Sequence, residues 1–197
     1  MKRMIHLLVV ATMTFLPFVA WADATEIDQA APPFKLKGLD GKEYNLENFK
    51  GKKAVVIMFI STRCPYSNAY NERMAALAQE FTAKNIAFLG INANGTESME
   101  AIREHAQEHK FAFPVLRDDG NVVADAYGAQ LTPEIFVLDG NLTLRYHGRI
   151  DNSHKLNEVN THDLRDTLHA MLAGKEVVNK ETKAFGCSIK RVKKDSD

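Results

Sequence analysis

Cysteine is scarce in this sequence of 197 residues and occurs only at Cys64 and Cys187. Two cysteines are too few for the disulfide framework that holds many small secreted domains together. Neither sign of charge is in excess, because 25 Lys and Arg residues balance 25 Asp and Glu residues. The sequence therefore gives no indication of a polyanionic partner, and we do not expect nucleic-acid binding. Internal repeats and low-complexity runs are also missing.

The one long apolar run is near the start of the chain. Lys2 and Arg3 precede apolar residues from Met4 to Ala20, and the small-residue pattern Ala20-Trp21-Ala22 follows. This pattern predicts a cleavable secretory signal over residues 1–22, because the run is shorter than the roughly 20 residues of a spanning helix. An uncleaved anchor is the alternative. We expect residues 23–197 to work in the periplasm or outside the cell, without membrane contact after cleavage.

Apolar patterning after the signal indicates a strand, a helix and a second strand. Every residue from Ala54 to Ile60 is apolar, which is typical of a strand covered on both faces. A helical apolar stripe follows Cys64, formed by Tyr70, Met74, Leu77, Ala78 and Phe81. A second apolar strand covers residues 86–91. A parallel, right-handed crossover would place Cys64 at the carboxyl edge of the sheet.

The remaining pattern predicts one α/β domain over residues 23–174, with a central mixed sheet flanked by helices. An N-terminal β-hairpin is expected around Asp40-Gly41. We predict further helices over residues 97–109, 122–127 and 161–172, a strand over 114–116 and a hairpin from strands 134–138 and 142–146. Residues 175–197 form a C-terminal extension that carries Cys187. We expect this extension to be flexible, with its basic run 190–194 frayed.

Cys64 is the strongest candidate for a reactive group. It stands where the strand meets the helix, and backbone N–H groups at a helix start favour a thiolate. Arg63 adds a positive charge beside it, and such cysteines have pKa values of roughly 3.5 to 7.5 instead of about 8.5. Position 67 is Ser, so Cys64 lacks the second cysteine of a Cys-x-x-Cys pair. An inert buried thiol is the alternative.

Several segments together resemble the thioredoxin-like superfamily. They are Phe59 to Phe81 around Cys64, Ala126-Tyr127-Gly128-Ala129-Gln130-Leu131-Thr132-Pro133, Tyr146-His147-Gly148-Arg149-Ile150-Asp151, Leu172-Ala173-Gly174-Lys175 and Gly186-Cys187-Ser188-Ile189-Lys190. Their order and spacing are similar to those of redoxin, or peroxiredoxin-like (alkyl hydroperoxide reductase/thiol-specific antioxidant), domain proteins. The resemblance implies a thioredoxin-like fold over most of residues 23–174.

The resemblance also implies roles for individual residues. Cys64 matches the nucleophile, and Thr132 with a cis-Pro133 matches the loop that positions an extended peptide or thiol substrate. Ser61, Arg63 and Ser67 are the candidates for tuning the thiolate. Glu134 either tunes Cys64 or caps the following strand.

Two departures from the families weaken a simple assignment. A thioredoxin would have cysteine at position 67, and a peroxiredoxin would have proline and threonine where this chain has Ile57 and Ser61. Ser61 still offers a hydroxyl for an attacked peroxide. The proline that helps to shield the peroxide pocket of peroxiredoxins is absent here.

Cys187 is the remaining candidate to complete a reaction at Cys64. A cysteine on a flexible extension can return and resolve a sulfenate or mixed disulfide. A permanent structural disulfide between the two cysteines and an unpaired tail thiol are the alternatives, because connectivity cannot be read from sequence.

The sequence thus predicts a secreted or periplasmic thiol–disulfide oxidoreductase without a cofactor. It would act on a protein or small-molecule thiol or disulfide and use a separate reductant. A thiol-dependent peroxidase is one alternative, and a non-catalytic copper-binding thioredoxin-like module is another. His105 and His109 have i,i+4 spacing, but we expect ordinary surface or boundary histidines and predict no metal site. The direction of electron flow and the oligomeric state stay open.

Overall fold

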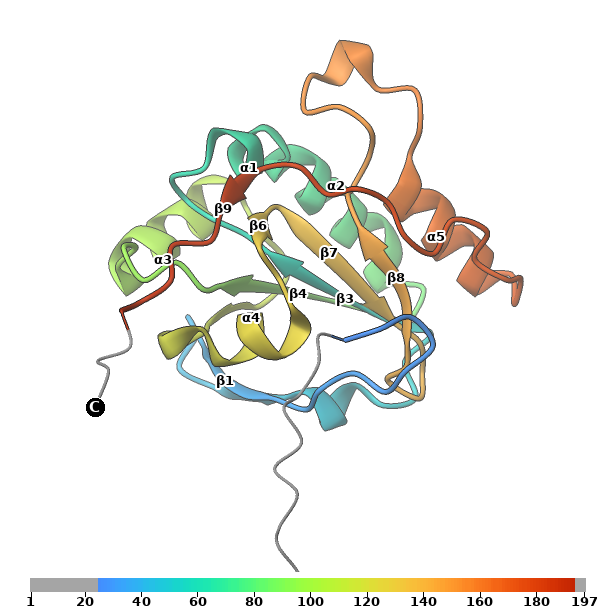
Figure 1. Ribbon diagram of the computed structural model, residues 1–197, viewed down its shortest axis with the longest axis horizontal. Helices are drawn as coiled ribbons and strands as arrows, with labels where there is room; N and C mark the ends of the chain where they lie inside the picture. Colours follow the sequence, from blue (N-terminus) through green and yellow to red (C-terminus); the bar gives the residue numbers. More distant parts are fainter. Residues whose placement is uncertain (1–24, 194–197) are drawn as a thin grey trace, which may run out of the picture.

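A mixed sheet of seven strands forms the centre of the chain in the computed structural model, which describes residues 25–193 (Figure 1). The strand order is β2-β1-β5-β4-β3-β7-β8. These strands are β1 (Lys35–Gly38), β2 (Glu43–Asn45), β3 (Ala54–Phe59), β4 (Ile86–Asn92), β5 (Val115–Arg117), β7 (Glu134–Leu138) and β8 (Leu144–Gly148). Strands β6 (Leu131–Thr132) and β9 (Cys187–Ser188) form a separate small sheet. The predicted signal at residues 1–22 lies outside the described residues.

Helices connect and cover the strands. The α-helices are α1 (Pro65–Ala69), α2 (Asn71–Thr82), α3 (Met99–Glu108), α4 (Val122–Tyr127) and α5 (Asp163–Leu172). Short 3-10 helices are η1 (Leu46–Phe49), η2 (Asp119–Asn121) and η3 (Leu156–Glu158). Within residues 25–193, none of the helices combines the length and the apolar character needed to cross a bilayer.

The centre of the sheet confirms the strand–helix–strand prediction. β3 is buried along its whole length and pairs in parallel with β4 and antiparallel with β7. A strand with neighbours on both sides and helices on both faces has no solvent-exposed face, which explains its unbroken apolar sequence. Its carboxyl end delivers the chain to Cys64.

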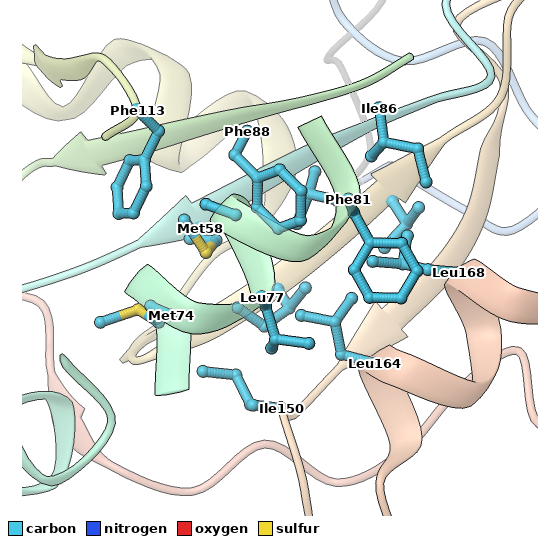
Figure 2. Close-up of a cluster of buried hydrophobic side chains, with 14 of the residues drawn as sticks. Met58, Met74, Leu77, Phe81, Ile86, Phe88, Phe113, Ile150, Leu164 and Leu168 are labelled. Carbon is cyan, nitrogen blue, oxygen red and sulfur yellow. The ribbon is translucent and has the colours of Figure 1, made fainter. Parts of the chain in front are cut away.

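Two apolar clusters fill the two faces of the sheet. Alternate β3 residues point to opposite faces, so Val56 and Met58 join one cluster and Val55 and Ile57 join the other. The first cluster packs against α2, α3 and α5, and Figure 2 shows its side chains, including Met58, Met74, Leu77, Phe81, Phe88, Leu164 and Leu168. The second contains residues of α4 and η1.

Two predicted elements differ from the observed ones. The helix expected after Cys64 is divided at Tyr70, whose φ of −101° and ψ of −4° end α1 before α2 begins. Strand β8 begins at Leu144 and not at residue 142. Leu142 has a φ of 64° in the turn, a conformation outside the extended region, although its side chain stays buried.

The expectation of a flexible, frayed C-terminal extension is wrong for residues 175–193. This segment runs from α5 across the edge of the sheet to β9, where it lies beside β6 (red in Figure 1). Backbone hydrogen bonds attach it along its length, including Thr182 N to His147 O (3.0 Å) and Ile189 N to Gln130 O (2.9 Å). The prediction failed because a basic, polar sequence gives no sign of backbone pairing with a distant segment.

Candidate active site

Cys64 caps the N-terminus of α1 at the carboxyl end of β3. Its side chain is nearly covered, with 3% of the residue exposed. The Cys64 Sγ accepts a hydrogen bond from the Ser67 N–H (3.3 Å) and donates one to the Thr132 carbonyl (3.1 Å). The sulfur is therefore held between a helix start and the loop before Pro133.

Cys187 reaches Cys64 because β9 pairs antiparallel with β6. The register places Cys187 opposite Thr132, whose carbonyl also contacts the Cys64 sulfur. Both cysteines are free thiols, and each shifts the pKa of the other.

The contact between the thiols shifts their pKa values in opposite directions. Burial by itself raises the pKa of Cys64, but hydrogen bonds from the Cys187 thiol and the Ser67 N–H outweigh burial and bring this pKa below its ordinary value. Burial and the neighbouring Cys64 sulfur raise the pKa of Cys187. Of the two thiols, Cys64 is therefore the one that ionises first as the pH rises.

Ser61 organises the loop that leads to Cys64. Its hydroxyl oxygen accepts hydrogen bonds from the N–H groups of Arg63 (3.2 Å) and Cys64 (3.1 Å). The hydroxyl proton is directed to a buried carboxylate, that of Glu97. Because this proton is already engaged, Ser61 does not present it to a peroxide at Cys64.

Glu97 is a member of the site that sequence reasoning missed. Glu97 is 4% exposed, and its carboxylate accepts hydrogen bonds from the Thr62 N–H (2.8 Å) and the Asn92 amide (2.7 Å). Burial by itself raises the pKa of Glu97, but hydrogen bonds from Ser61, Thr62 and Asn92 outweigh burial and bring it below the ordinary value. A signal was present, since Glu97 follows β4, and parallel strands end at one edge.

Ser67 and Arg63 occupy very different environments. Ser67 is fully buried, and its hydroxyl oxygen accepts a hydrogen bond from the Ser61 N–H (3.1 Å). It therefore locks the loop while its own N–H binds Cys64. Arg63 is exposed, and its guanidinium makes no hydrogen bond or ion pair with the described part of the chain. Hydrogen bonds, and not Arg63, are the causes of the lowered pKa of Cys64.

The bond between Thr132 and Pro133 is cis, and the Thr132 carbonyl contacts the Cys64 sulfur. The Glu134 carboxylate binds the backbone of the loop that precedes Pro133. One carboxylate oxygen accepts hydrogen bonds from the N–H groups of Gln130 (2.7 Å) and Leu131 (2.8 Å), while the other contacts His147 Nε2 (2.7 Å). Of the two roles considered for Glu134, the structure shows a contact with the loop and not with Cys64.

The predicted copper alternative needs ligands in addition to the two thiols. Across residues 25–193, no three His, Cys, Asp or Glu side chains are grouped so that they would hold a metal ion. His105 and His109 do stack near each other, with ring centroids 4.4 Å apart. They contact Phe111 and not the cysteines.

Residues 27–147, more than half of the chain, match the AhpC/TSA family. The chain belongs to the AhpC/TSA family. Its architecture is the thioredoxin-like fold, as the sequence predicted.

Relatives of this AhpC/TSA-family chain include two kinds of named redox protein. It is 29% identical over 114 residues to thiol-disulfide oxidoreductase ResA of Bacillus thuringiensis, covering 58% of this chain and 64% of that protein. It is 30% identical over 117 residues to chloroplastic peroxiredoxin Q of Sedum lineare, covering 56% and 61%. The chain thus spans less than two thirds of the length of these relatives.

A solved structure covers more of the chain. The crystal structure of an uncharacterized conserved protein from Geobacillus kaustophilus is 33% identical, with a TM-score of 0.81. The match covers 89% of this chain and 96% of that one.

Proposed function

We propose that this protein is a thiol–disulfide oxidoreductase that cycles between a Cys64–Cys187 dithiol and an intramolecular disulfide. The observation that carries this proposal is the β6–β9 pairing, which sets Cys187 opposite Thr132, whose carbonyl contacts the Cys64 sulfur. Both cysteines are free thiols, and their pKa values are shifted apart. The relatives named for thiol–disulfide exchange and as peroxiredoxin support redox chemistry at such a site.

The reaction proceeds in two exchanges. The Cys64 thiolate attacks one sulfur of a disulfide, the S–S bond breaks, and one thiolate leaves, so that Cys64 is joined to the substrate in a mixed disulfide. Cys187 then loses its proton and attacks the Cys64 sulfur, and the second substrate thiol leaves with a proton. The substrate gains two electrons, and the pair becomes a disulfide. A separate thiol reductant returns the pair to the dithiol.

Supporting residues hold the reacting sulfurs. The Ser67 N–H stabilises the Cys64 thiolate. Ser61 and Glu97 hold the loop before Cys64, and Glu134 holds the Thr132 loop opposite it. This network holds the Cys64 sulfur in place for the first attack, while β9 carries Cys187, the sulfur of the second.

The test is a peptide map under non-reducing conditions. Oxidised wild-type protein should yield a peptide pair joined through Cys64 and Cys187. Cys187→Ser should instead accumulate a mixed disulfide at Cys64 that a reductant removes. A Cys64 that stays a free, alkylation-resistant thiol in both proteins would exclude the proposal. A pair that stays oxidised under physiological thiol reductants would favour a static structural disulfide.

A thiol peroxidase is the second candidate, favoured by the AhpC/TSA family and the peroxiredoxin relative. There, Cys64 attacks the O–O bond of a hydroperoxide, becomes a sulfenic acid and releases an alcohol or water, and Cys187 displaces water to form the same disulfide. The rates at which a hydroperoxide and a disulfide oxidise the reduced protein distinguish the peroxidase from the thiol–disulfide oxidoreductase.

We also place this activity in the periplasm or outside the cell, where disulfides persist. The support is the basic, apolar and small-residue pattern over residues 1–22. N-terminal sequencing of the protein recovered from a periplasmic fraction should begin at Asp23. Recovery of the whole chain with its first residues intact in the cytoplasm would contradict this placement.

A further inference from the structure

The C-terminal segment over residues 186–192 occupies the backbone edge beside Cys64. Exposed edges offer N–H and C=O groups to any extended peptide, which gains affinity by adding a strand. Here β9 takes the β6 edge, with Cys187 opposite Thr132 and Ser188 opposite Leu131. The Ile189 N–H also donates to the Gln130 carbonyl (2.9 Å). The chain itself therefore fills the position of an extended peptide.

Two asparagines anchor this segment downstream of Cys187. Asn94 Oδ1 accepts from the Lys190 N–H, and Asn121 Oδ1 accepts from the Val192 N–H, both at 2.8 Å. The Gly95 N–H donates a hydrogen bond to the Lys190 carbonyl (2.8 Å). Both asparagines are buried, at 2% and 1% exposed. They bind backbone groups of the segment, and the Arg191 side chain adds a hydrogen bond to the Ala129 carbonyl (2.7 Å) and an ion pair with Asp125 (2.9 Å).

Upstream of Cys187, hydrogen bonds and ring contacts also attach the segment to the rest of the fold. The Thr182 hydroxyl bonds to the Tyr146 hydroxyl (2.7 Å) and accepts from the Arg149 N–H (3.1 Å). The Phe185 ring packs against the rings of Tyr66 and Tyr70, each with centroids 6.3 Å apart. Cys187 is thus fixed from both sides.

Gly186 brings the segment into close backbone contact with the loop before Pro133. A Cβ atom on Gly186 would lie 2.1 Å from the Thr132 carbonyl oxygen and 2.7 Å from its carbon. Any other residue would have to move this part of the segment away from the loop. The close approach leaves no room for a second peptide between them.

We propose that Cys64 is oxidised by a low-molecular-weight compound with a weak S–S or O–O bond, and that β9 excludes protein disulfides from it. This inference rests on the proposed redox function and specifies its substrate. A small disulfide gives a mixed disulfide and a free thiol, and a hydroperoxide gives a sulfenic acid and an alcohol or water. In both reactions, Cys187 then closes the disulfide with Cys64.

A protein disulfide would need the segment to detach first. Its rate of reaction would then be reduced by the fraction of molecules that are open. A minor conformation of this kind is commonly populated at about 0.1–10%, so we expect protein disulfides to react at least about tenfold more slowly than small oxidants.

The experiment follows the loss of the Cys64 thiol in the reduced protein by acid quenching and mass spectrometry. Three oxidants are compared at equal concentration: oxidised glutathione, tert-butyl hydroperoxide and native insulin. We expect either small oxidant to exceed insulin by at least about tenfold. The two small compounds distinguish a disulfide substrate from a hydroperoxide. An equal rate with insulin would overturn the proposal.

Two variants test the cause of the difference. Gly186→Ala displaces β9, and Phe185→Ala weakens the upstream attachment if the first variant does not fold. Either should raise the insulin rate toward the small-oxidant rate, and Lys183→Ala, at an exposed position of the same segment, should leave the ratio unchanged. An unchanged ratio in folded Gly186→Ala and Phe185→Ala also rejects the proposal. Failure of all three oxidants to modify Cys64 would instead reject the redox function itself.

Discussion

At the scale of residues, the two cysteines are chemically unequal although the β6–β9 pairing brings them to one site. The Cys64 sulfur accepts from the Ser67 N–H and lies at a helix start, whereas Cys187 lies on a strand. A negative charge is stabilised where donors converge. The arrangement therefore supports the proposal that Cys64 attacks as the thiolate while Cys187 keeps its proton.

The pH dependence of Cys64 tests this assignment. Its thiolate absorbance should appear with a midpoint below the ordinary cysteine pKa of about 8.5. Cys187→Ala removes a hydrogen-bond donor and should move the midpoint upward, while Ser188→Ala should not. The same lowered pKa stabilises the fold above the unfolded-state value, and this stabilisation is lost as the pH falls through the folded-state pKa. A midpoint at or above the ordinary value would contradict the assignment.

A second prediction concerns Glu97. Its carboxylate accepts hydrogen bonds from Ser61, Thr62 and Asn92, and an amide at this position would point a donor at one of these donors. Glu97→Gln should lower the free energy of unfolding by about 1–3 kcal/mol in a denaturant titration at neutral pH.

Glu104→Gln is the matched control for Glu97, because Glu104 is exposed on α3. The lowered pKa of Glu97 adds a pH signature. Its stabilisation is present above the unfolded-state pKa of about 4.3 and is lost as the pH falls through the lower folded-state value. Equal stability of both variants would show that the network is unimportant.

At the scale of elements, an ion pair ties α2 to the loop after β8. Arg73 Nη1 lies 2.6 Å from Asp151 Oδ2, and the side chains are 17% and 4% exposed. The Tyr70 hydroxyl donates to the same carboxylate (2.9 Å), and Arg73 also donates to the carbonyls of Ser153 and His154. These contacts position the loop whose His154 ring packs on Tyr66, next to Cys64.

Breaking this pair should cost far more than breaking an exposed one. Asp151→Ala leaves a mostly buried guanidinium without its carboxylate, and we expect a loss of about 3 kcal/mol in unfolding free energy. Lys155→Ala removes the exposed pair with Glu158, and should change it by less than about 1 kcal/mol. Chemical denaturation of both variants gives the comparison. A similar effect of the two substitutions would argue against a structural role for the Arg73–Asp151 contact.

At the scale of the whole molecule, the C-terminal segment connects distant parts of the fold. It bonds to β8 through Thr182, to Gln130 just before β6 through Ile189, and to the loop after β4 through Lys190. A disulfide between Cys64 and Cys187 would close most of the chain into a loop. The redox state of one bond should therefore affect the stability of the entire protein.

Oxidised protein should resist denaturant better than reduced protein. Cross-links across a loop of about 100 residues stabilise by roughly 4.7 kcal/mol in the chain-entropy model, and we expect an effect of about 3–5 kcal/mol. Unfolding titrations with and without a reductant measure it. The Cys187→Ser variant should show no dependence on reductant. An oxidised wild type no more stable than the reduced one would mean that the pairing strains the fold.

Local pattern determined the central architecture from the sequence alone. The apolar run of β3, the helical stripe of α2 and the turn residues of the hairpins predicted a strand–helix–strand unit with Cys64 at its edge. These features could be predicted because burial on both faces of a strand and the helical period each produce a regular apolar pattern in neighbouring residues. The resemblance to thioredoxin-like proteins then located Thr132 and Pro133.

Only the tertiary structure decided what surrounds Cys64. β9 has two residues, too few to show any periodicity, and its partner β6 lies far away in the sequence. Glu97 joins Ser61 across 36 positions, and the asparagine anchors accept backbone groups that every residue except proline carries. Such contacts depend on how the folded backbone is arranged and not on side-chain pattern. The sequence therefore predicted a reactive cysteine and named Cys187 as its candidate partner, and the fold brings Cys187 to the loop that contacts Cys64.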